Sequence, residues 1–160
     1  MRVFAGIVAL AMIASPALAQ DWGTDFNMGT FAAGGGSPAN GYLNLECAGE
    51  GSGFDFAGQP FIALTVIDGE QLDKKSLPDE ITFWVDDEQS YLLPMSIEEG
   101  STTRLVYDYS ADTVEQARGL VEAMRQGSIV TAKADENIIA SLDLEGSNDT
   151  LELVEDCIAP

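Results

Sequence analysis

The sequence contains no histidine. This absence excludes the Ser-His-Asp and Cys-His catalytic systems, in which histidine is the general base. It also removes a common ligand of zinc and copper. A serine nucleophile with a lysine base is arithmetically possible, but Lys74, Lys75 and Lys133 lie in ordinary surface contexts. We therefore predict a protein that is not an enzyme, with no cofactor and no metal site.

Basic residues are scarce, with 7 lysines and arginines against 27 aspartates and glutamates and a net charge of −20. A surface this acidic repels nucleic acid and anionic lipid, so neither is expected as a partner. Three uses of the charge stay open: a solvated surface that maintains solubility, a cationic protein or peptide partner, and a divalent cation. The hydrophobic content of 46% argues against disorder.

Long apolar runs are confined to the N-terminus. Arg2 is followed by an almost unbroken apolar run over residues 3–14 and by the small-x-small sequence of residues 17–19. This order is typical of a secretory signal peptide, and about a dozen apolar residues are fewer than the roughly 20 that a membrane-spanning helix needs. We predict a signal peptide over residues 1–19 and one secreted domain over residues 20–160, in the bacterial periplasm or outside the cell. Loss of Arg2 leaves 6 basic residues against 27 acidic residues, a net charge of −21.

Cysteine occurs twice, at Cys47 and Cys157, which lie 110 positions apart. In an oxidising compartment an isolated pair is most simply a disulfide, and there is no Cys-x-x-Cys sequence that would favour a redox role. Chain-entropy models give a loop of this length about 4–5 kcal/mol of stabilisation, from which strain in the native state subtracts.

Alternating apolar and polar residues predict a series of short antiparallel strands. Residues 21–31 could supply an edge strand, whereas residues 32–41, with Gly34 to Gly36 at their centre, are expected to form a flexible loop. Pro94 suggests an edge position or a bulge. The expected strands cover residues 42–47, 61–67, 81–85, 91–97, 102–109, 129–134 and 138–144, the last two as a hairpin.

Two helices are expected. Asp112 with Glu115 resembles a capping box before a helix over residues 113–126, which Gly127 would end. One stripe of this helix should be buried, and it consists of Val114, Ala117, Leu120, Val121 and Met124. A short C-terminal helix is indicated by Leu151, Val154 and Cys157, which recur every third residue. The predicted fold class is thus α+β, with an antiparallel β-sandwich-like core, one mid-chain amphipathic helix, a short C-terminal helix and one disulfide.

Candidate functional residues are few. Trp84 is expected on the strand face opposite Phe83 and Val85, beside Asp86 and Asp87, and exposed tryptophan is enriched at protein interfaces. These three residues are the candidate binding surface, although Trp84 could instead be buried in the core. The run over residues 143–149 is rich in oxygen ligands for calcium but fails the EF-hand spacing.

A resemblance to a known family appears in the C-terminal third. A helix ending at Met124 to Ser128, a strand over residues 129–132, and residues 140–147 running on to Cys157 resemble small alphaproteobacterial periplasmic proteins of the invasion-associated locus B type. The resemblance covers roughly residues 113–157, and its shared elements are structural. It implies a secreted, non-enzymatic, β-rich domain.

The expected function is that of a secreted or periplasmic, non-catalytic binding or envelope-associated protein. Its negative charge suggests a cationic protein partner, for example a basic hydrolase such as lysozyme, which it would inhibit. The alternatives are a small carboxylate-based hydrolase, using pairs such as Asp86 with Glu88, and a calcium-binding secreted domain.

Overall fold

The computed structural model describes residues 22–27, 29–49 and 53–158, and of these the side chains of Asn27 and residues 156–158 stay undescribed. Nine strands and two helices follow one another along this part of the chain. They are β1 (Gly23–Asn27), β2 (Thr30–Ser37), β3 (Gly41–Ala48), β4 (Phe61–Thr65), β5 (Glu80–Val85), β6 (Gln89–Ile97), β7 (Arg104–Tyr107), α1 (Val114–Gln126), β8 (Ile129–Ala134), β9 (Asn137–Asp143) and α2 (Ser147–Ile158). The predicted signal peptide, residues 1–19, lies outside the described residues.

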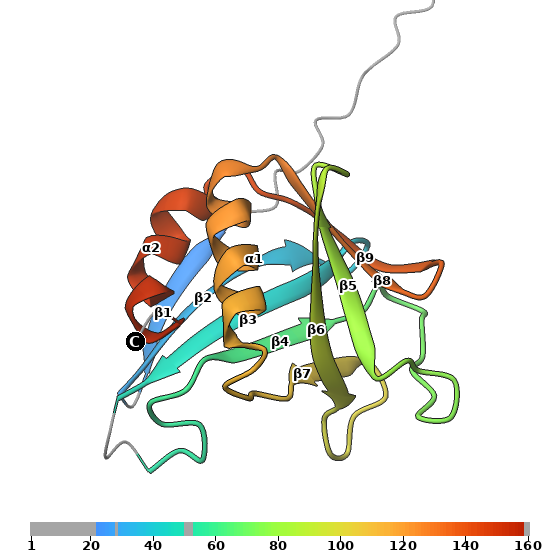
Figure 1. The fold of residues 1–160 in the computed structure, drawn as a ribbon, viewed down its shortest axis with the longest axis horizontal. Coiled ribbons are helices and arrows are strands. Elements are labelled where there is room, and N and C mark those ends of the chain that lie inside the picture. Colours follow the sequence, from blue (N-terminus) through green and yellow to red (C-terminus); the bar gives the residue numbers. More distant parts are fainter. Residues whose placement is uncertain (1–21, 28, 50–52, 159–160) are drawn as a thin grey trace, which may run out of the picture.

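All nine strands belong to one antiparallel sheet with the order β1-β2-β3-β4-β7-β6-β5-β8-β9. The α+β class and the antiparallel pairing are therefore as the sequence predicts. The strands nevertheless form a continuous sheet and not two separate sheets of a sandwich. Figure 1 shows β5 and β6 running steeply across the direction of β2, β3 and β4.

The sheet changes direction along β6. The first part of this long strand pairs with β5, up to Pro94 opposite Glu80, whereas Met95 to Ile97 pair with β7. Proline has no N–H to donate to a ladder, so it is tolerated where one partner strand ends and the next begins. The Pro94 carbonyl accepts the N–H of Asp108 at 2.9 Å. Pro94 thus lies inside the sheet, between two partners, and the edge position suggested by the sequence is wrong.

Both helices cover the same side of the sheet, α2 against β1, β2 and β3 and α1 against β5 and β6, and they also pack against each other (Figure 1). The hydrophobic core lies between the helices and the sheet. Its largest side chains that are almost completely buried are Phe83, Leu43, Leu45, Ile62, Leu64, Ile81, Leu93, Leu105, Leu120, Met124, Leu142 and Leu151.

The glycine-rich segment that the sequence marked as a flexible loop is the second half of β2, paired with β3 along its length. The ring of Trp22 explains why residue 35 is a glycine. A Cβ at this position would lie 2.8 Å from two atoms of the ring. The indole Nε1–H of Trp22 also donates to the carbonyl of Asp143 at 2.7 Å. Gly36 has φ +133°, and a Cβ there would lie 2.2 Å from the carbonyl oxygen of Gly41. Tertiary packing therefore overrides the loop preference of these glycines.

The helix α1 begins differently from the predicted capping box. Its N-cap is Thr113, which makes no side-chain cap hydrogen bond, and Asp112 lies outside the helix. The Thr113 hydroxyl instead lies 2.8 Å from the hydroxyl of Tyr107. The predicted stripe is confirmed for Ala117, Leu120, Val121 and Met124, which are buried, whereas Val114 is half-buried.

The C-terminal helix is confirmed as α2. Cys47 on β3 faces it, with Sγ 3.3 Å from the carbonyl oxygen of Val154. The predicted disulfide depends on the side chain of Cys157, which lies outside the described residues. Within the described residues, no helix is both long and apolar enough to cross a membrane.

Candidate functional site

The three residues of the predicted binding surface lie around the β5–β6 hairpin, but they do not form one site. Trp84 is half-buried and points to the sheet face opposite Phe83 and Val85. The ammonium group of Lys133 lies 5.5 Å from the centre of its ring, a cation–π contact with the neighbouring strand β8. Trp84 therefore faces away from the side on which Val85 approaches α1.

Asp86 has a structural role. Its Oδ1 accepts the backbone N–H groups of Ser128 and Ile129, each at 2.9 Å, and its own N–H donates to the carbonyl of Ile129 at 3.0 Å. These bonds tie the hairpin to the connection between α1 and β8. The carboxylate is therefore already engaged by two donors.

Asp87 is exposed like Asp86, but its carboxylate lacks the backbone hydrogen bonds that Asp86 accepts. Asp86 and Asp87 have φ 53° and 57°, the left-handed conformation that tight hairpin turns require and that aspartate tolerates better than most residues. Both aspartates therefore fit the geometry of the turn, and only Asp87 presents its carboxylate to solvent without such ties.

A groove lies between this hairpin and α1. Its volume is about 460 Å³. Three of its lining residues are acidic: Asp86 and Glu88 from the hairpin, and Glu122 from α1. The other lining residues are Val85, Gln89, Tyr91, Gly119, Ala123, Gln126 and Gly127.

Two glycines allow the helix and the hairpin to approach closely enough to form the groove. A Cβ at Gly119, within α1, would lie 2.7 Å from Cε1 of Tyr91. A Cβ at Gly127, just after α1, would lie 2.4 Å from Cγ1 of Val85. Both distances are shorter than carbon atoms tolerate, so a larger residue at either position would push the two elements apart.

Tyr91 in the groove is affected both by burial and by a nearby negative charge. Burial raises the pKa of the Tyr91 hydroxyl above its ordinary value of 10.0, and the negative charge of Glu122 raises this pKa further. The hydroxyl donates to Oε1 of Gln89 at 2.8 Å. An acidic groove of this kind suits an ammonium or guanidinium group better than any anion.

Sequence reasoning missed Glu88, Tyr91 and Glu122 as a group, because they come from two elements about 30 positions apart. Gly119 was the signal that could have indicated them. Glycine inside a helix costs about 1 kcal/mol relative to alanine, so it needs a packing or functional reason.

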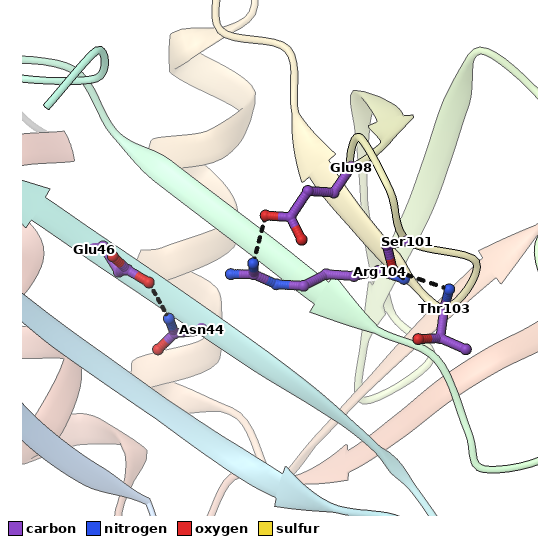
Figure 2. Close-up of polar contacts among 6 residues, drawn as sticks. All are labelled: Asn44, Glu46, Glu98, Ser101, Thr103 and Arg104. Carbon is purple, nitrogen blue, oxygen red and sulfur yellow. Dashed lines mark hydrogen bonds and ion pairs between the residues drawn. The ribbon is translucent and has the colours of Figure 1, made fainter.

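Polar pairs also occur on the sheet face that points away from the helices. Figure 2 shows Arg104 of β7 with Glu98, whose Oε1 accepts from Nη1 at 2.5 Å. On β3, which β4 separates from β7, Nδ2 of Asn44 donates to Oε1 of Glu46 at 2.5 Å (Figure 2). On this face Arg104 thus pairs with a charged partner, whereas the carboxylate of Glu46 accepts from a neutral amide.

The run considered for calcium forms the connection from β9 to α2. Oδ1 of Asp143 accepts the N–H of Glu145 at 2.7 Å, and the Ser147 hydroxyl donates to the carbonyl of Met124 at 2.9 Å. Among the residues that the structure describes, no three acidic or cysteine side chains gather in a way that could hold a metal ion.

A family model described as YfjT matches residues 20–151. The chain belongs to the YfjT family. No curated protein and no solved structure matches it. Since the family description names no activity or ligand, the functional argument depends on the residues themselves.

Proposed function

We propose that this member of the YfjT family is a non-catalytic binding protein of the bacterial periplasm or the secreted fraction, with a cationic protein as its partner. The observation that carries the proposal is the groove between the β5–β6 hairpin and α1, which Glu88, Tyr91 and Glu122 line and in which Glu122 acts on Tyr91. The net charge of −20 supports it, because complementary charge speeds the encounter of two proteins. A basic secreted hydrolase such as lysozyme fits this description.

The binding test uses purified mature protein and lysozyme as the basic hydrolase. We expect inhibition of the hydrolase and an affinity that falls clearly between low and high salt, since salt screens exposed charges over about 8 Å at physiological strength. An inhibitory effect that ignores salt would contradict a charge-driven interface and leave the acidic surface with a solubilising role only.

Matched double variants separate the groove from the overall charge. Glu88→Gln with Glu122→Gln removes two charges from the groove, and Glu70→Gln with Glu136→Gln removes two exposed charges elsewhere. The groove variant should lose more affinity than the control. Equal losses would show that net charge alone drives binding. Turnover of a glycan that Glu122→Gln abolishes would instead support the carboxylate-based hydrolase.

Export is part of the proposal. Arg2, the apolar run and the Ala-Leu-Ala sequence of residues 17–19 support a cleaved signal peptide. Exported protein should therefore begin at Gln20, which N-terminal sequencing of periplasmic material would establish. Exported protein that still begins at Met1 would contradict both the cleavage and the localisation.

A Cys47–Cys157 disulfide completes the proposal. Val154, whose carbonyl lies beside the Cys47 sulfur, is three residues before Cys157 on α2, and residues at this spacing share a helix face. There is also no free cysteine among the described residues. Cys157→Ser should lower the free energy of unfolding by about 2–5 kcal/mol. Two reactive thiols in denatured, unreduced periplasmic protein would refute the disulfide.

A further inference from the structure

The two edge strands of the sheet, β1 and β9, differ in whether another segment hydrogen-bonds to their outer side. At β9, the N–H of Ser141 donates to the carbonyl of Asn40 and the N–H of Ile67 donates to the carbonyl of Ile139, each at 2.9 Å. Loops therefore cover this edge. At the other edge β1 pairs with β2, and among the described residues no segment pairs with its outer side. An uncovered edge presents unpaired N–H and C=O groups to any extended chain.

We propose that β1 accepts an extended segment of the cationic partner as an additional antiparallel strand. This inference rests on the function proposed above and names a second surface through which the same partner binds. Main-chain hydrogen bonds to an exposed edge are a general way to bind an extended peptide, and alternate side chains then supply specificity.

The outward-pointing donors of β1 can be assigned. The N–H of Phe26 donates to the carboxylate of its neighbour Asp25 at 2.8 Å, so this N–H points away from β2. Because hydrogen-bonding direction alternates along an edge strand, the N–H of Thr24 points outward as well. In the free protein the carboxylate of Asp25 accepts the N–H of Phe26. A carbonyl group of an incoming strand would take the place of this carboxylate.

The length of the mature N-terminus and the net charge of the chain indicate which segment pairs with the outer side of β1. In the mature chain proposed above, only Gln20 and Asp21 precede Trp22, which are too few residues to turn and run back along β1. A second copy would bring together two mature chains, each with 6 basic and 27 acidic residues and thus a net charge of −21. Antiparallel pairing centred on β1 would also place the two copies of Asp25, its middle residue, beside each other, and like charges in that position destabilise the pair.

The side chains of β1 indicate the pattern of the incoming strand. Asp25 lies on one face and favours a lysine or arginine opposite it. Phe26 lies on the other face, with 60% of its side chain exposed, and its ring centre is 4.6 Å from that of Phe31, which is 46% exposed. This exposed aromatic pair favours apolar residues. Period two therefore predicts a strand in which basic and apolar residues alternate.

The experiment uses a labelled peptide in which lysine alternates with valine, long enough to cover the five residues of β1. A lysine–proline peptide carries the same charge but lacks N–H groups at every second position. The lysine–valine peptide should bind about tenfold more tightly, as two additional net hydrogen bonds predict. Its binding should also slow amide hydrogen exchange at Thr24 and Phe26.

Variants of β1 provide the controls. Thr24→Pro removes one outward N–H and should abolish the preference for the lysine–valine peptide, provided that thermal unfolding shows an intact fold. Asp25→Asn should weaken binding, whereas Asp135→Asn removes the same charge at the exposed turn between β8 and β9 and should leave the preference unchanged.

The outcomes separate the two proposals. Binding of lysine peptides that is insensitive to Thr24→Pro would overturn the role of β1 and leave the cationic partner standing. A glutamate–valine peptide that binds as tightly as lysine–valine would overturn the choice of a basic segment. Dimerisation of the mature protein that Thr24→Pro abolishes would show a second copy to be the occupant. Absence of binding to every lysine peptide and to lysozyme would refute the proposed function itself.

Discussion

Asp86 and Asp87 are adjacent, both exposed and both in the left-handed backbone conformation, yet their surroundings differ. The carboxylate of Asp86 accepts the backbone N–H groups of Ser128 and Ile129, whereas Asp87 points into solvent. Charge and sequence position would have given the two residues the same role. Their hydrogen bonds give Asp86 a structural role that Asp87 does not share.

Substitution by asparagine should distinguish the two residues. Asparagine tolerates the same backbone conformation, so each substitution removes only the charge and the acceptor strength of a carboxylate. Asp86→Asn should lower the free energy of unfolding by about 1 kcal/mol, because it weakens its bonds to two backbone donors. Asp87→Asn should leave stability unchanged. Denaturant titrations of both variants provide the measurement, and equal stabilities would show that the bonds of Asp86 contribute nothing.

Tyr91 reports the electrostatics of the groove. Burial and then the charge of Glu122 raise its pKa above 10.0 in the folded protein. The folded state therefore holds this proton more tightly than the unfolded state, and the resulting stabilisation is complete below pH 10.0 and lost as the pH rises through the raised pKa. Glu122→Gln should lower the pKa of Tyr91 without restoring its ordinary value, because burial persists.

Ultraviolet titration measures this pKa. The titration curve of the Tyr91→Phe variant is subtracted from that of the unchanged protein, which leaves the signal of Tyr91 alone. Glu115→Gln is the control, since Glu115 lies elsewhere on α1 and pairs with Arg118 at 2.7 Å. If Glu115→Gln and Glu122→Gln shift the pKa equally, the effect comes from net charge and not from the groove.

At the scale of elements, α1 combines two tasks. One stripe fills the core, and the adjoining face, with Gly119 and Glu122, forms one wall of the groove. The helix is held at both ends by tertiary contacts: Thr113 lies beside Tyr107, and Arg125 forms ion pairs with Glu152 and Glu155 of α2. The position of the groove wall therefore depends on how well the stripe packs.

Leu120 tests the buried stripe of α1. Only 1% of its side chain is exposed, so Leu120→Ala should lower the free energy of unfolding by about 2–5 kcal/mol through lost contacts and a residual cavity. Leu153→Ala on α2 is the matched control, because 56% of that side chain is exposed and its loss should change stability by less than about 0.5 kcal/mol. Calorimetry on both variants measures the change in the free energy of unfolding. A change for Leu120→Ala as small as that for Leu153→Ala would mean that the helix does not pack as described.

At the scale of the whole molecule, the net charge of −20 acts against folding. Self-repulsion among acidic side chains destabilises a compact chain relative to an expanded one. The acidic residues of the groove add to this repulsion. Repulsion between like charges also opposes the association of two copies through β1, whose outer side no described segment pairs with.

Salt should therefore stabilise the fold. Raising the ionic strength from about 0.01 M to about 0.15 M shortens the screening distance from about 30 Å to about 8 Å. We expect Tm to rise over this range, and equally with sodium and potassium chloride, because screening depends on ionic strength and not on the cation. A Tm that stays constant would show that the acidic residues are too well dispersed to repel one another.

Local sequence patterns were enough to predict the features that depend on residues close together in the chain, namely strands and amphipathic helices. Period two located most of the strands, and the spacing of Leu120, Val121 and Met124 located the buried stripe of α1. These periodicities follow from the backbone geometry of strands and helices, which is why they can be recognised without a structure. The lack of histidine likewise narrowed the possible chemistry before any fold was known.

Tertiary structure decided whatever depends on residues far apart in the sequence. It made the glycine-rich segment a strand through the ring of Trp22, placed Pro94 between two partner strands, and gave Asp86 its donors from the α1–β8 connection. It also brought Glu122 to the same groove as Tyr91 and, among the described residues, left the outer side of β1 without a partner strand. Each of these outcomes depends on packing and pairing between distant segments, and neither composition nor local periodicity carries that information.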